Sequence, residues 1–369
     1  GTYPDPECTV LREKIGQLGL LFNAVAGVLM AVFLFSGAGA ILRMVGIADA
    51  LYEPALIYLK IVGGGCILNA VIPIFSSYLR AFGYTKQPLY ATIVGNIANF
   101  VMNAVFLFVL HKGVAGVATA TVISKILNLC IVLYFSHKLI SAKNSTERIA
   151  NKTVLGQIVK VGLPSACETA LYNVAMMLVI RFLNQMDAEG LNVTARSYTA
   201  TISNFSYCVG AALAQANAIM TGWHIGAGEL EECDRGTKRA AFVGVCVAVC
   251  METAIVLGSG FIMPLFTDNP EMTALVRKLL AIDIVLEIGR VTNLVFGQAL
   301  KTSGDAVFPA VIAAVFMFVF AVGGTWLFGI SMGLMAVGAY IGLASDECVR
   351  AVGMVWRWKT GKWRTKKLV

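Results

Sequence analysis

Charged side chains are scarce in this chain, and their scarcity excludes an ordinary soluble protein. Asp, Glu, Lys and Arg make up 14% of its 369 residues, whereas 58% are hydrophobic and the mean hydropathy is +0.76. A soluble domain carries roughly 25% charged residues, because a soluble core cannot bury so much apolar surface. The composition therefore indicates a protein that crosses a lipid bilayer several times.

Histidine is also rare, which argues against an integral-membrane enzyme. The three histidines, His111, His137 and His224, lie on separate connections and form no cluster that could act in catalysis or bind a metal. The nine cysteines form no CxxC pair, so we interpret them as small buried hydrophobic residues. We predict no enzyme activity, no cofactor and no zinc or disulfide. A purely structural membrane protein stays open, although acidic residues inside apolar runs argue against it.

The excess of basic residues, 29 Lys and Arg against 21 Asp and Glu, does not indicate nucleic-acid binding. Besides the C-terminal tail, the connections rich in Lys and Arg are 80–88, 137–153, 223–239 and 299–305. The connections dominated by Asp and Glu are 46–54, 184–195 and 264–273. This alternation follows the positive-inside rule and predicts a cytoplasmic C-terminus, with the first visible residues also inside the cell. The expected partner is the lipid bilayer, with no nucleic acid.

Ten apolar runs are long enough to cross a bilayer, which takes about 20 residues as a helix. They are 18–42, 55–80, 88–110, 114–136, 154–183, 196–222, 240–263, 274–298, 306–330 and 333–356. We predict a helix for each run, because a helix satisfies its own backbone hydrogen bonds inside the membrane.

An internal repeat relates the two halves of the chain. The stretch Tyr78–Pro88 recurs as Ala299–Pro309, and its Leu, Gly and Pro positions each return 221 residues later. Other matches at this offset, such as Gly39 with Gly260, extend the register over several helices. The repeat predicts two homologous halves, an arrangement typical of secondary transporters.

The repeat also indicates that the first half is shorter than the second. The spans 154–183 and 196–222 have no counterpart at this offset, so we expect two further helices, about 70 residues, before residue 1. The alternative is a genuine ten-helix protein. The predicted fold is all-α and polytopic, with two pseudo-symmetric bundles of six helices and the first two helices of the first bundle missing here. Its parts are an N-terminal lobe (1–140), a cytoplasmic linker (141–153), a C-terminal lobe (154–356) and a basic cytoplasmic tail (357–369).

We single out four ionisable residues inside apolar runs, where a charge costs about 3 kcal/mol. Glu168 is one, and Asp283, Glu287 and Arg290 share one helical face at i, i+4 and i+7. A carboxylate removed from water binds a proton or a cation such as Na⁺. These four residues are therefore candidates for cation coupling, with possible Na⁺ binding at Glu168 or Glu287 and no other metal. Two alternatives stay open: a fixed Glu287–Arg290 ion pair, and hydration of Asp283 near the outer interface.

Polar and aromatic residues on several helices predict a cavity for organic molecules. The candidates are Tyr172, Asn173, Met176, Asn204, Tyr207, Gln215, Asn293, Asn96, Asn99 and Asn103. Aromatic and thioether walls with a few amide groups suit amphipathic or cationic compounds. Ordinary packing is the alternative for any single aromatic or methionine, and hydrogen bonding between helices is the alternative for the three asparagines at i, i+3 and i+7.

Several motifs together resemble the multidrug and toxic compound extrusion (MATE) family over nearly the whole chain. They are Tyr78–Pro88 with Asn96 and Asn103, Gly162–Glu168, Gly222–Glu229, and Glu287–Arg290 with Asn293, Gly304, Asp305 and Pro309. The resemblance implies twelve helices in two six-helix lobes, a V-shaped central cavity, and rocker-like exchange of organic cations or other drugs for Na⁺ or H⁺.

The sequence departs from the family pattern at two positions. One branch uses an aspartate in the first helix of the first lobe, and this chain lacks that helix. Another branch has its glutamate eight residues after the proline of the seventh helix, where this chain has Tyr172. The resemblance thus implies a coupling role for Glu168 by helix only, while Glu287 and Arg290 match a Glu-x-x-Arg-x-x-Asn pattern of bacterial members.

The resulting hypothesis is a monomeric multidrug efflux antiporter of a bacterial inner membrane. Glu168 and Glu287 would bind the coupling Na⁺ or H⁺, and Arg290 would orient or release it. The alternative is a flippase for a lipid-linked oligosaccharide, which would need several basic residues inside the helices. Only Arg290 is a clear case, since Arg181 and Arg196 lie nearer the helix ends.

Overall fold

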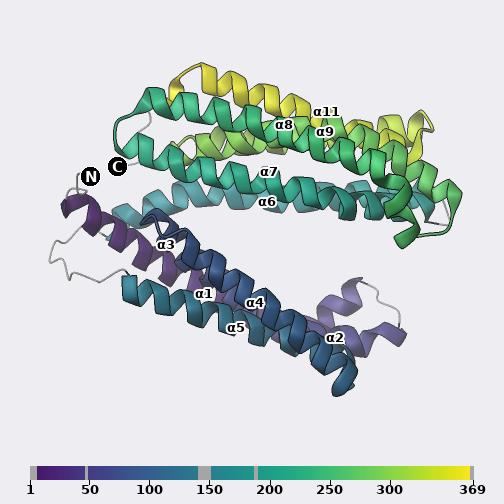
Figure 1. Ribbon diagram of the computed structural model, residues 1–369, viewed down its shortest axis with the longest axis horizontal. Helices are drawn as coiled ribbons and strands as arrows, with labels where there is room; N and C mark the ends of the chain where they lie inside the picture. Colours follow the sequence, from purple (N-terminus) through teal and green to yellow (C-terminus); the bar gives the residue numbers. More distant parts are fainter. Residues whose placement is uncertain (1–5, 46–48, 140–150, 187–189, 366–369) are drawn as a thin grey trace. The chain divides into compact units, whose positions relative to one another are not determined.

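The computed structural model describes residues 6–45, 49–139, 151–186 and 190–365. These residues are mostly helical, with short turns between the helices, and they form no β-strand. Each of the ten predicted spans coincides with a helix or with consecutive helical segments, so the predicted all-α, polytopic fold is confirmed. The chain divides into two compact units, Gly1–Ile158 (unit 1) and Val159–Val369 (unit 2) (Figure 1). Of the predicted linker, residues 141–150 lie outside the described residues.

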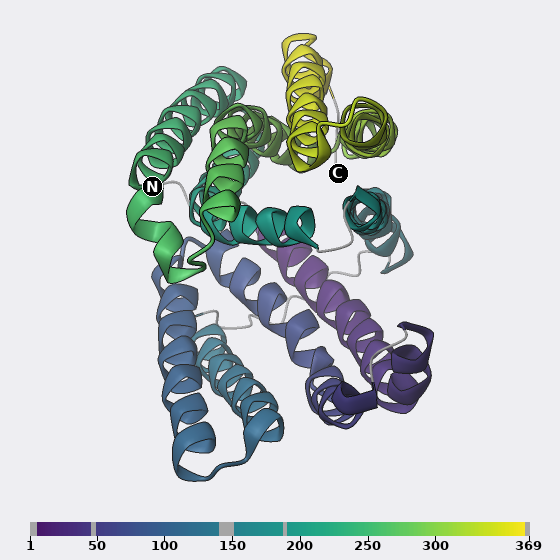
Figure 2. The ribbon, with the colours of Figure 1, turned by 90° about the vertical axis from the view of Figure 1, so that its right-hand side faces the viewer.

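The described residues of unit 1 form five α-helices, and two of these helices together correspond to the second predicted span. They are α1 (Pro6–Val45), α2 (Asp49–Gly64), α3 (Cys66–Ala81), α4 (Lys86–Ala104) and α5 (Gly113–Leu139), with a π-helical turn, η1 (Val105–Val109), after α4. α1 packs against α2 and α3, and α4 lies beside α5, to which a tight turn connects it (Figure 2).

In the part of unit 2 that the structure describes, there are six α-helices, with α9 at the centre. They are α6 (Asn151–Met186), whose first residues belong to unit 1, α7 (Leu191–Gly226), α8 (Leu230–Ile262), α9 (Pro270–Thr302), α10 (Val307–Phe316) and α11 (Met335–Lys359). Shorter segments are the 3₁₀ turns η2 (Met263–Leu265) and η5 (Lys362–Thr365) and the π-helical η3 (Met317–Val322) and η4 (Thr325–Ser331). α9 packs against α7, α8 and α11, which makes it the centre of this unit.

The turns after α3 and α9 have the same backbone geometry, as the sequence repeat predicts. Gly83 and Gly304 both adopt the left-handed conformation, with φ of 86° and 91°. In each turn the residue after the glycine donates its N–H to the carbonyl oxygen five residues earlier, at 2.9 Å in both cases. This Schellman-type helix end favours glycine, because a Cβ disfavours positive φ.

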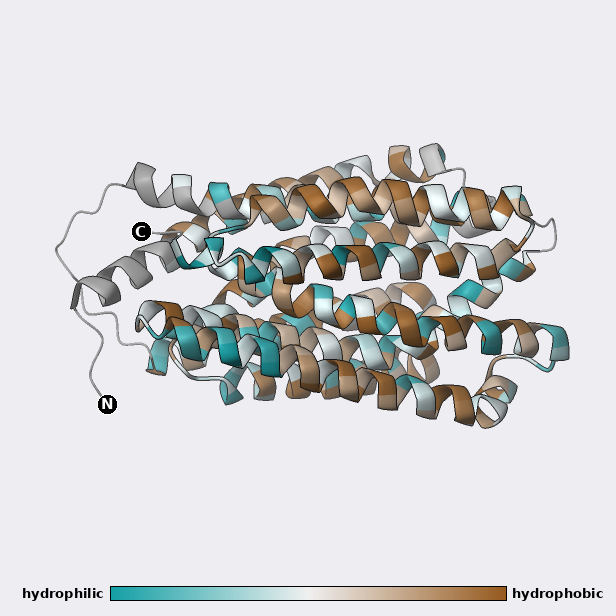
Figure 3. Ribbon diagram, turned by 90° about the horizontal axis from the view of Figure 1, so that it is seen from above, coloured by the Kyte–Doolittle hydropathy of each residue, from teal (hydrophilic) through white to brown (hydrophobic). Residues whose placement is uncertain are grey.

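Seven spans of the described residues are long and apolar enough to cross a membrane, fewer than the ten predicted. The three that do not qualify are α7, α9 and α11, whose buried faces carry polar or charged side chains. Hydrophobic residues dominate the helices, and hydrophilic residues collect near several of their ends (Figure 3). The number is lower because polar side chains reduce the hydropathy of a helix whether they face lipid or the interior of the bundle.

The start of the predicted basic tail folds back onto unit 2. Trp363 of η5 stacks on Trp358 with ring centroids 4.2 Å apart, and Nε1 of Trp358 donates to Asp234 at 2.7 Å. Arg364 forms an ion pair with Glu231 at 2.5 Å. We call these five residues the tail clasp. The tail clasp ties the end of α11 to the first turns of α8.

Close packing of α9 on α11 depends on Gly289. A Cβ at this position would lie 2.7 Å from the backbone nitrogen of Cys348 and 2.8 Å from the carbonyl carbon of Glu347. Because these are backbone atoms, a helix must shift to make room. We expect Gly289→Ala to lower stability by about 1–3 kcal/mol, measured as a lower aggregation temperature in detergent. Gly260→Ala on α8 is the control, since its Cβ meets nothing within 4 Å, and equal aggregation temperatures would contradict the prediction.

Candidate functional site

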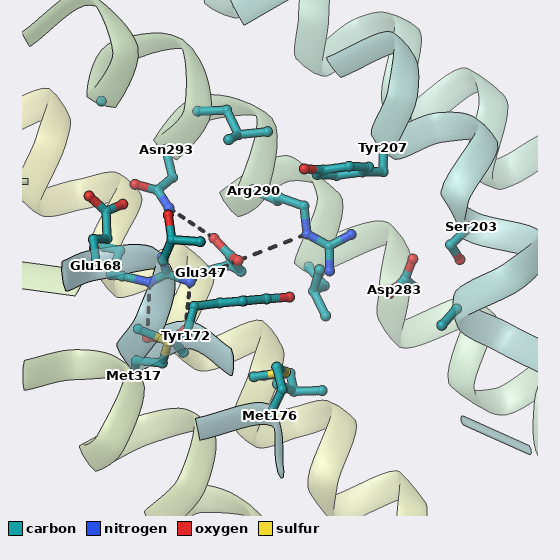
Figure 4. Close-up of a pocket in the computed structure, with 18 of the residues that line it drawn as sticks. Glu168, Tyr172, Met176, Ser203, Tyr207, Asp283, Arg290, Asn293, Met317 and Glu347 are labelled. Atoms are coloured by element: carbon teal, nitrogen blue, oxygen red, sulfur yellow. Dashed lines mark hydrogen bonds and ion pairs between the residues drawn. The ribbon is translucent and has the colours of Figure 1, made fainter. Parts of the chain in front are cut away.

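A cavity of about 590 Å³ lies within unit 2, and it is lined by side chains of α6, α7, α9, α10, η3 and α11 (Figure 4). Aromatic and thioether side chains form part of its wall, namely Tyr172, Met176, Tyr207 and Met317. The volume suits a drug-sized molecule. The cavity thus combines apolar walls with the charged groups described next.

Eight charged side chains line this cavity, and their formal charges balance. The acids are Glu168, Asp283, Asp346 and Glu347, and the bases are Arg196, Arg290, Lys301 and Arg350. Charges inside a membrane protein are stabilised by partners of opposite sign, so their pairing determines which of them can act on a ligand.

Two of the four bases are held in ion pairs on the cavity wall. Nζ of Lys301 lies 2.7 Å from Oε2 of Glu168, which joins α9 to α6. Nη2 of Arg350 lies 2.7 Å from Oδ2 of Asp346 and 2.8 Å from Oε1 of Glu347, all on α11. These groups satisfy one another and leave little free charge for a ligand.

A third base, Arg290, lies between two acidic groups. Its Nη1 forms a close ion pair with the buried carboxylate of Glu287, and its Nε lies 3.9 Å from Oε1 of Glu347. Nδ2 of Asn293 donates to the other oxygen of Glu347 at 3.0 Å, and the guanidinium lies 5.7 Å from the ring centroid of Tyr207 (Figure 4). Arg290 therefore connects a buried acid with the cavity.

A cluster of three buried carboxylates, which we call the acidic triad, includes Glu287. Glu252 of α8 and Asp283 and Glu287 of α9 each place an oxygen within 4.8 Å of the others. Their exposed fractions are 0%, 3% and 0%. Among the described residues, Arg290 is the base that forms an ion pair with the acidic triad, and neither oxygen of Glu252 has a hydrogen-bond partner.

The acidic triad carries more negative charge than Arg290 can balance. Burial of unbalanced like charges is costly in a low-dielectric interior, so the carboxylates gain stability by binding a proton or another cation. Carboxylate oxygens are ligands for hard cations, and a shared proton is the alternative for closely spaced acids. The acidic triad can therefore hold Na⁺ or H⁺ next to a cavity for organic molecules.

Most of the predicted site residues lie on the cavity wall. They are Glu168, Tyr172, Asn173, Met176, Asn204, Tyr207, Asp283, Arg290 and Asn293. Glu287 is not on the wall and lies in the acidic triad. The structure brings Asp283 and Glu287 together, whereas Glu168 lies in a separate ion pair with Lys301.

Gln215, another predicted cavity residue, does not line this cavity. It is exposed and lies eight residues after Tyr207, about 12 Å farther along α7. Its helical rotation differs from that of Asn204 by only about 20°. Gln215 thus shares a helical face with Asn204 and lies beyond this cavity along the helix axis.

The three asparagines of α4 belong to unit 1 and do not line this cavity. Nδ2 of Asn99 donates to Oγ of Ser124 on α5 at 3.3 Å, and Asn103 donates to Asn99 at 3.1 Å. Asn96 is exposed. Hydrogen bonding between helices was one of the two roles predicted for Asn99, and the structure has this bond.

Sequence analysis missed four charged residues of this site: Glu252, Asp346, Glu347 and Arg350. Glu252 is a single acid within the apolar run 240–263, and the other three have i, i+1 and i+4 spacing within 333–356. The criterion that selected Asp283 and Glu287, charge inside an apolar run, also applies to these residues. Lys301 was assigned to a connection, but α9 extends to Thr302 and includes it.

Comparison with known proteins gives a consistent family assignment. The family model described as MatE matches residues 12–105 and 164–327. The chain is 32% identical over 359 residues to the uncharacterized transporter YisQ of Bacillus subtilis, which covers 96% of this chain and 78% of that protein. It is 20% identical over 325 residues to the probable multidrug resistance protein NorM of Thermotoga maritima, covering 85% and 68%.

A solved structure supports the fold independently. The crystal structure of a mutant of the Vibrio cholerae MATE transporter VcmN is similar with a TM-score of 0.87. It covers 96% of this chain and 80% of its own, at 17% sequence identity. At this identity the likeness concerns the fold alone.

Proposed function

The chain belongs to the MatE family, whose members are multi-pass membrane transporters and not enzymes, and from this premise we propose that it exports amphipathic organic compounds in exchange for Na⁺ or H⁺. We place the protein in a bacterial inner membrane, with its C-terminus in the cytoplasm. We propose that it acts as a monomer. The similarity to the Thermotoga maritima relative, a probable multidrug resistance protein, supports a role in drug export.

The observation that carries the proposal is the acidic triad beside the cavity. A transporter that exchanges two solutes needs a site for each and a physical link between them. The acidic triad supplies buried carboxylates for the coupling ion, and the cavity supplies apolar walls for an organic molecule. Asp283 belongs to both, since it lines the cavity and is a member of the acidic triad.

Arg290 supplies the proposed link between the two sites. When the acidic triad holds no ion, the guanidinium balances the charge of Glu287. A cation that enters the acidic triad competes with Arg290 for Glu287, because both positive charges bind the same carboxylate oxygens. Arg290 is then free to turn toward Glu347, which its Nε already approaches at 3.9 Å. This movement brings positive charge toward the cavity and disfavours a bound organic cation.

The opposition between ion and substrate has the sign that antiport requires. Ion binding favours the conformation that releases substrate, and substrate binding favours the conformation that releases the ion. Glu168 has a supporting role in this scheme, because its ion pair with Lys301 ties α6 to α9 across the cavity wall. A rearrangement of α9 would strain this pair.

A flippase for a lipid-linked oligosaccharide is the second candidate, and one observation favours it. The cavity is lined by four bases, more than the single clear case predicted from sequence. Four acids balance them, and three of the bases form ion pairs with carboxylates. A lipid-linked pyrophosphate carries concentrated negative charge and would find little uncompensated positive charge here, so drug export is the better supported function.

Ethidium transport in everted membrane vesicles tests the proposal. Na⁺ and H⁺ gradients are imposed separately, and dye accumulation is compared between vesicles with and without the protein. We expect accumulation that follows one of the two gradients and stops when an ionophore collapses it. A well-expressed protein that moves none of several cationic and zwitterionic dyes under either gradient would contradict drug export and favour the flippase.

A further inference from the structure

Arg196 is the one base on the cavity wall that forms no ion pair with any described residue. Its nearest polar contact is Nη2 to the sulfur of Met176 at 3.6 Å. A thioether is a weak hydrogen-bond acceptor and carries no charge, so it does not neutralise a guanidinium. The other three bases each have a carboxylate partner.

The position of Arg196 directs its charge inward. It is the sixth residue of α7, between Ala195 and Thr199, which are both fully buried, and its own side chain is only partly exposed and lines the cavity. A guanidinium at a membrane interface normally reaches outward to water. Here it lines the cavity, and no described carboxylate lies within ion-pair distance of it.

The matching free acid on the same wall is Asp283. It is 3% exposed, it forms no ion pair, and its Oδ2 has no hydrogen-bond partner among the described residues. Among the described residues, the cavity thus presents one guanidinium and one carboxylate without an ion-pair partner, with Tyr172 and Met176 among the other groups of the wall. Every other charged group on the wall lies in an ion pair.

We propose that this cavity is selective for zwitterionic amphipathic molecules, with the anionic group of the substrate bound by Arg196 and its cationic group directed to Asp283. A guanidinium binds carboxylate, sulfonate or phosphate groups through charge-assisted hydrogen bonds. A simple organic cation would leave Arg196 uncompensated, and a simple anion would leave Asp283 uncompensated. A molecule with both charges balances the wall, because unpaired charge in a low-dielectric site is costly.

This inference rests on the proposed function, since the cavity is taken as the substrate site, and it specifies the substrate class. It also agrees with the antiport scheme. The cationic group of the substrate and the coupling ion would compete for the same carboxylate, while Arg196 stays bound to the anionic group and gives the selectivity.

Two dyes that differ in one charge test the proposal. Tetramethylrhodamine has a free carboxylate and is zwitterionic, whereas its methyl ester has the same ring system and is a cation. Binding to the purified protein in detergent is measured by fluorescence polarisation. We expect the wild-type protein to bind the zwitterion about tenfold more tightly than the ester, as loss of one charge-assisted contact predicts.

Substitution of Arg196 should remove this preference selectively. In Arg196→Gln the affinity for the zwitterion is expected to fall about tenfold, whereas the affinity for the ester stays within about twofold. Arg196→Lys should retain part of the preference, because it keeps the charge and loses the fork of donors. Arg181→Gln on α6 is the matched control, since Arg181 is exposed and does not line the cavity.

The wild-type protein alone can overturn the inference, so the test does not depend on a variant that folds. Equal or weaker binding of the zwitterion relative to the ester would exclude the proposed selectivity, as would an equal effect of Arg196→Gln on both dyes. Failure of the proposed function has a different signature, because then neither dye is transported under an imposed ion gradient. Transport of both dyes without preference would leave the antiporter intact and reject the role of Arg196.

Discussion

Gradient-driven dye export is expected to fall at least about tenfold in Glu252→Gln, which removes one negative charge from the acidic triad and keeps the side-chain shape. An interaction with a charged group contributes about 1.5–3 kcal/mol, which corresponds to a tenfold to hundredfold weaker site for the coupling ion. Dye binding to the purified protein should stay within about threefold of wild type, because Glu252 does not line the cavity. Transport in vesicles and polarisation in detergent measure the two quantities separately.

Glu271→Gln is the control for Glu252→Gln. Glu271 lies in the first turn of α9, is exposed and takes no part in the acidic triad. The same chemical change there should leave transport at the wild-type rate. Wild-type export by Glu252→Gln would reject the acidic triad as the coupling site, and loss of dye binding together with transport would indicate a folding defect instead.

Arg290→Gln is expected to destabilise the protein by about 3 kcal/mol, because it breaks a buried ion pair. This value is near the lower end of the range for such pairs, since the Arg290 side chain is 24% exposed. The change leaves the charge of Glu287 uncompensated beside Glu252 and Asp283. The expected readout is a lower yield of monodisperse protein and a lower aggregation temperature in detergent. Stability equal to wild type would show that the acidic triad is neutral without Arg290.

The double variant Arg290→Gln with Glu287→Gln separates the structural role of this pair from its coupling role. Removal of both charges eliminates the uncompensated carboxylate, so most of the lost stability should return. Transport should not return, because the link between the acidic triad and the cavity is gone. Dye binding by the double variant is expected to be less sensitive to Na⁺ and pH than binding by wild type, because only the direct competition at Asp283 remains. A double variant that exports dye normally would make the pair a purely structural element.

The helices were predictable from the sequence because the bilayer imposes a simple rule. A chain segment in hydrocarbon must satisfy its own backbone hydrogen bonds, so each long apolar run becomes a helix. The repeat added a finer prediction, since Gly83 and Gly304 indeed end α3 and α9 with equivalent left-handed turns. Composition alone is less informative for α7, α9 and α11, because their polar side chains face the interior of unit 2.

The sequence could predict which site residues share a face of one helix, but not which residues of different helices lie together. The spacing of Asp283 and Glu287 indicates that they share a face of α9, and the structure has both in the acidic triad. That Glu252 joins them depends on how α8 is rotated against α9, which is a property of packing and not of local sequence. The same limit applies to Gln215, because helical periodicity gives its face of α7 and does not show how far along α7 the cavity extends.

The stacked Trp358 and Trp363 of the tail clasp are an intrinsic spectroscopic probe. Two indole rings 4.2 Å apart and nearly parallel, at 11°, are close enough for their electronic transitions to couple. Coupled indoles produce a paired signal in circular dichroism that is lost when the rings separate. Because one ring is bonded to Asp234 on α8, this signal reports whether the end of α11 stays attached to α8. Conformational changes at that end of unit 2 can thus be followed during transport without any added label.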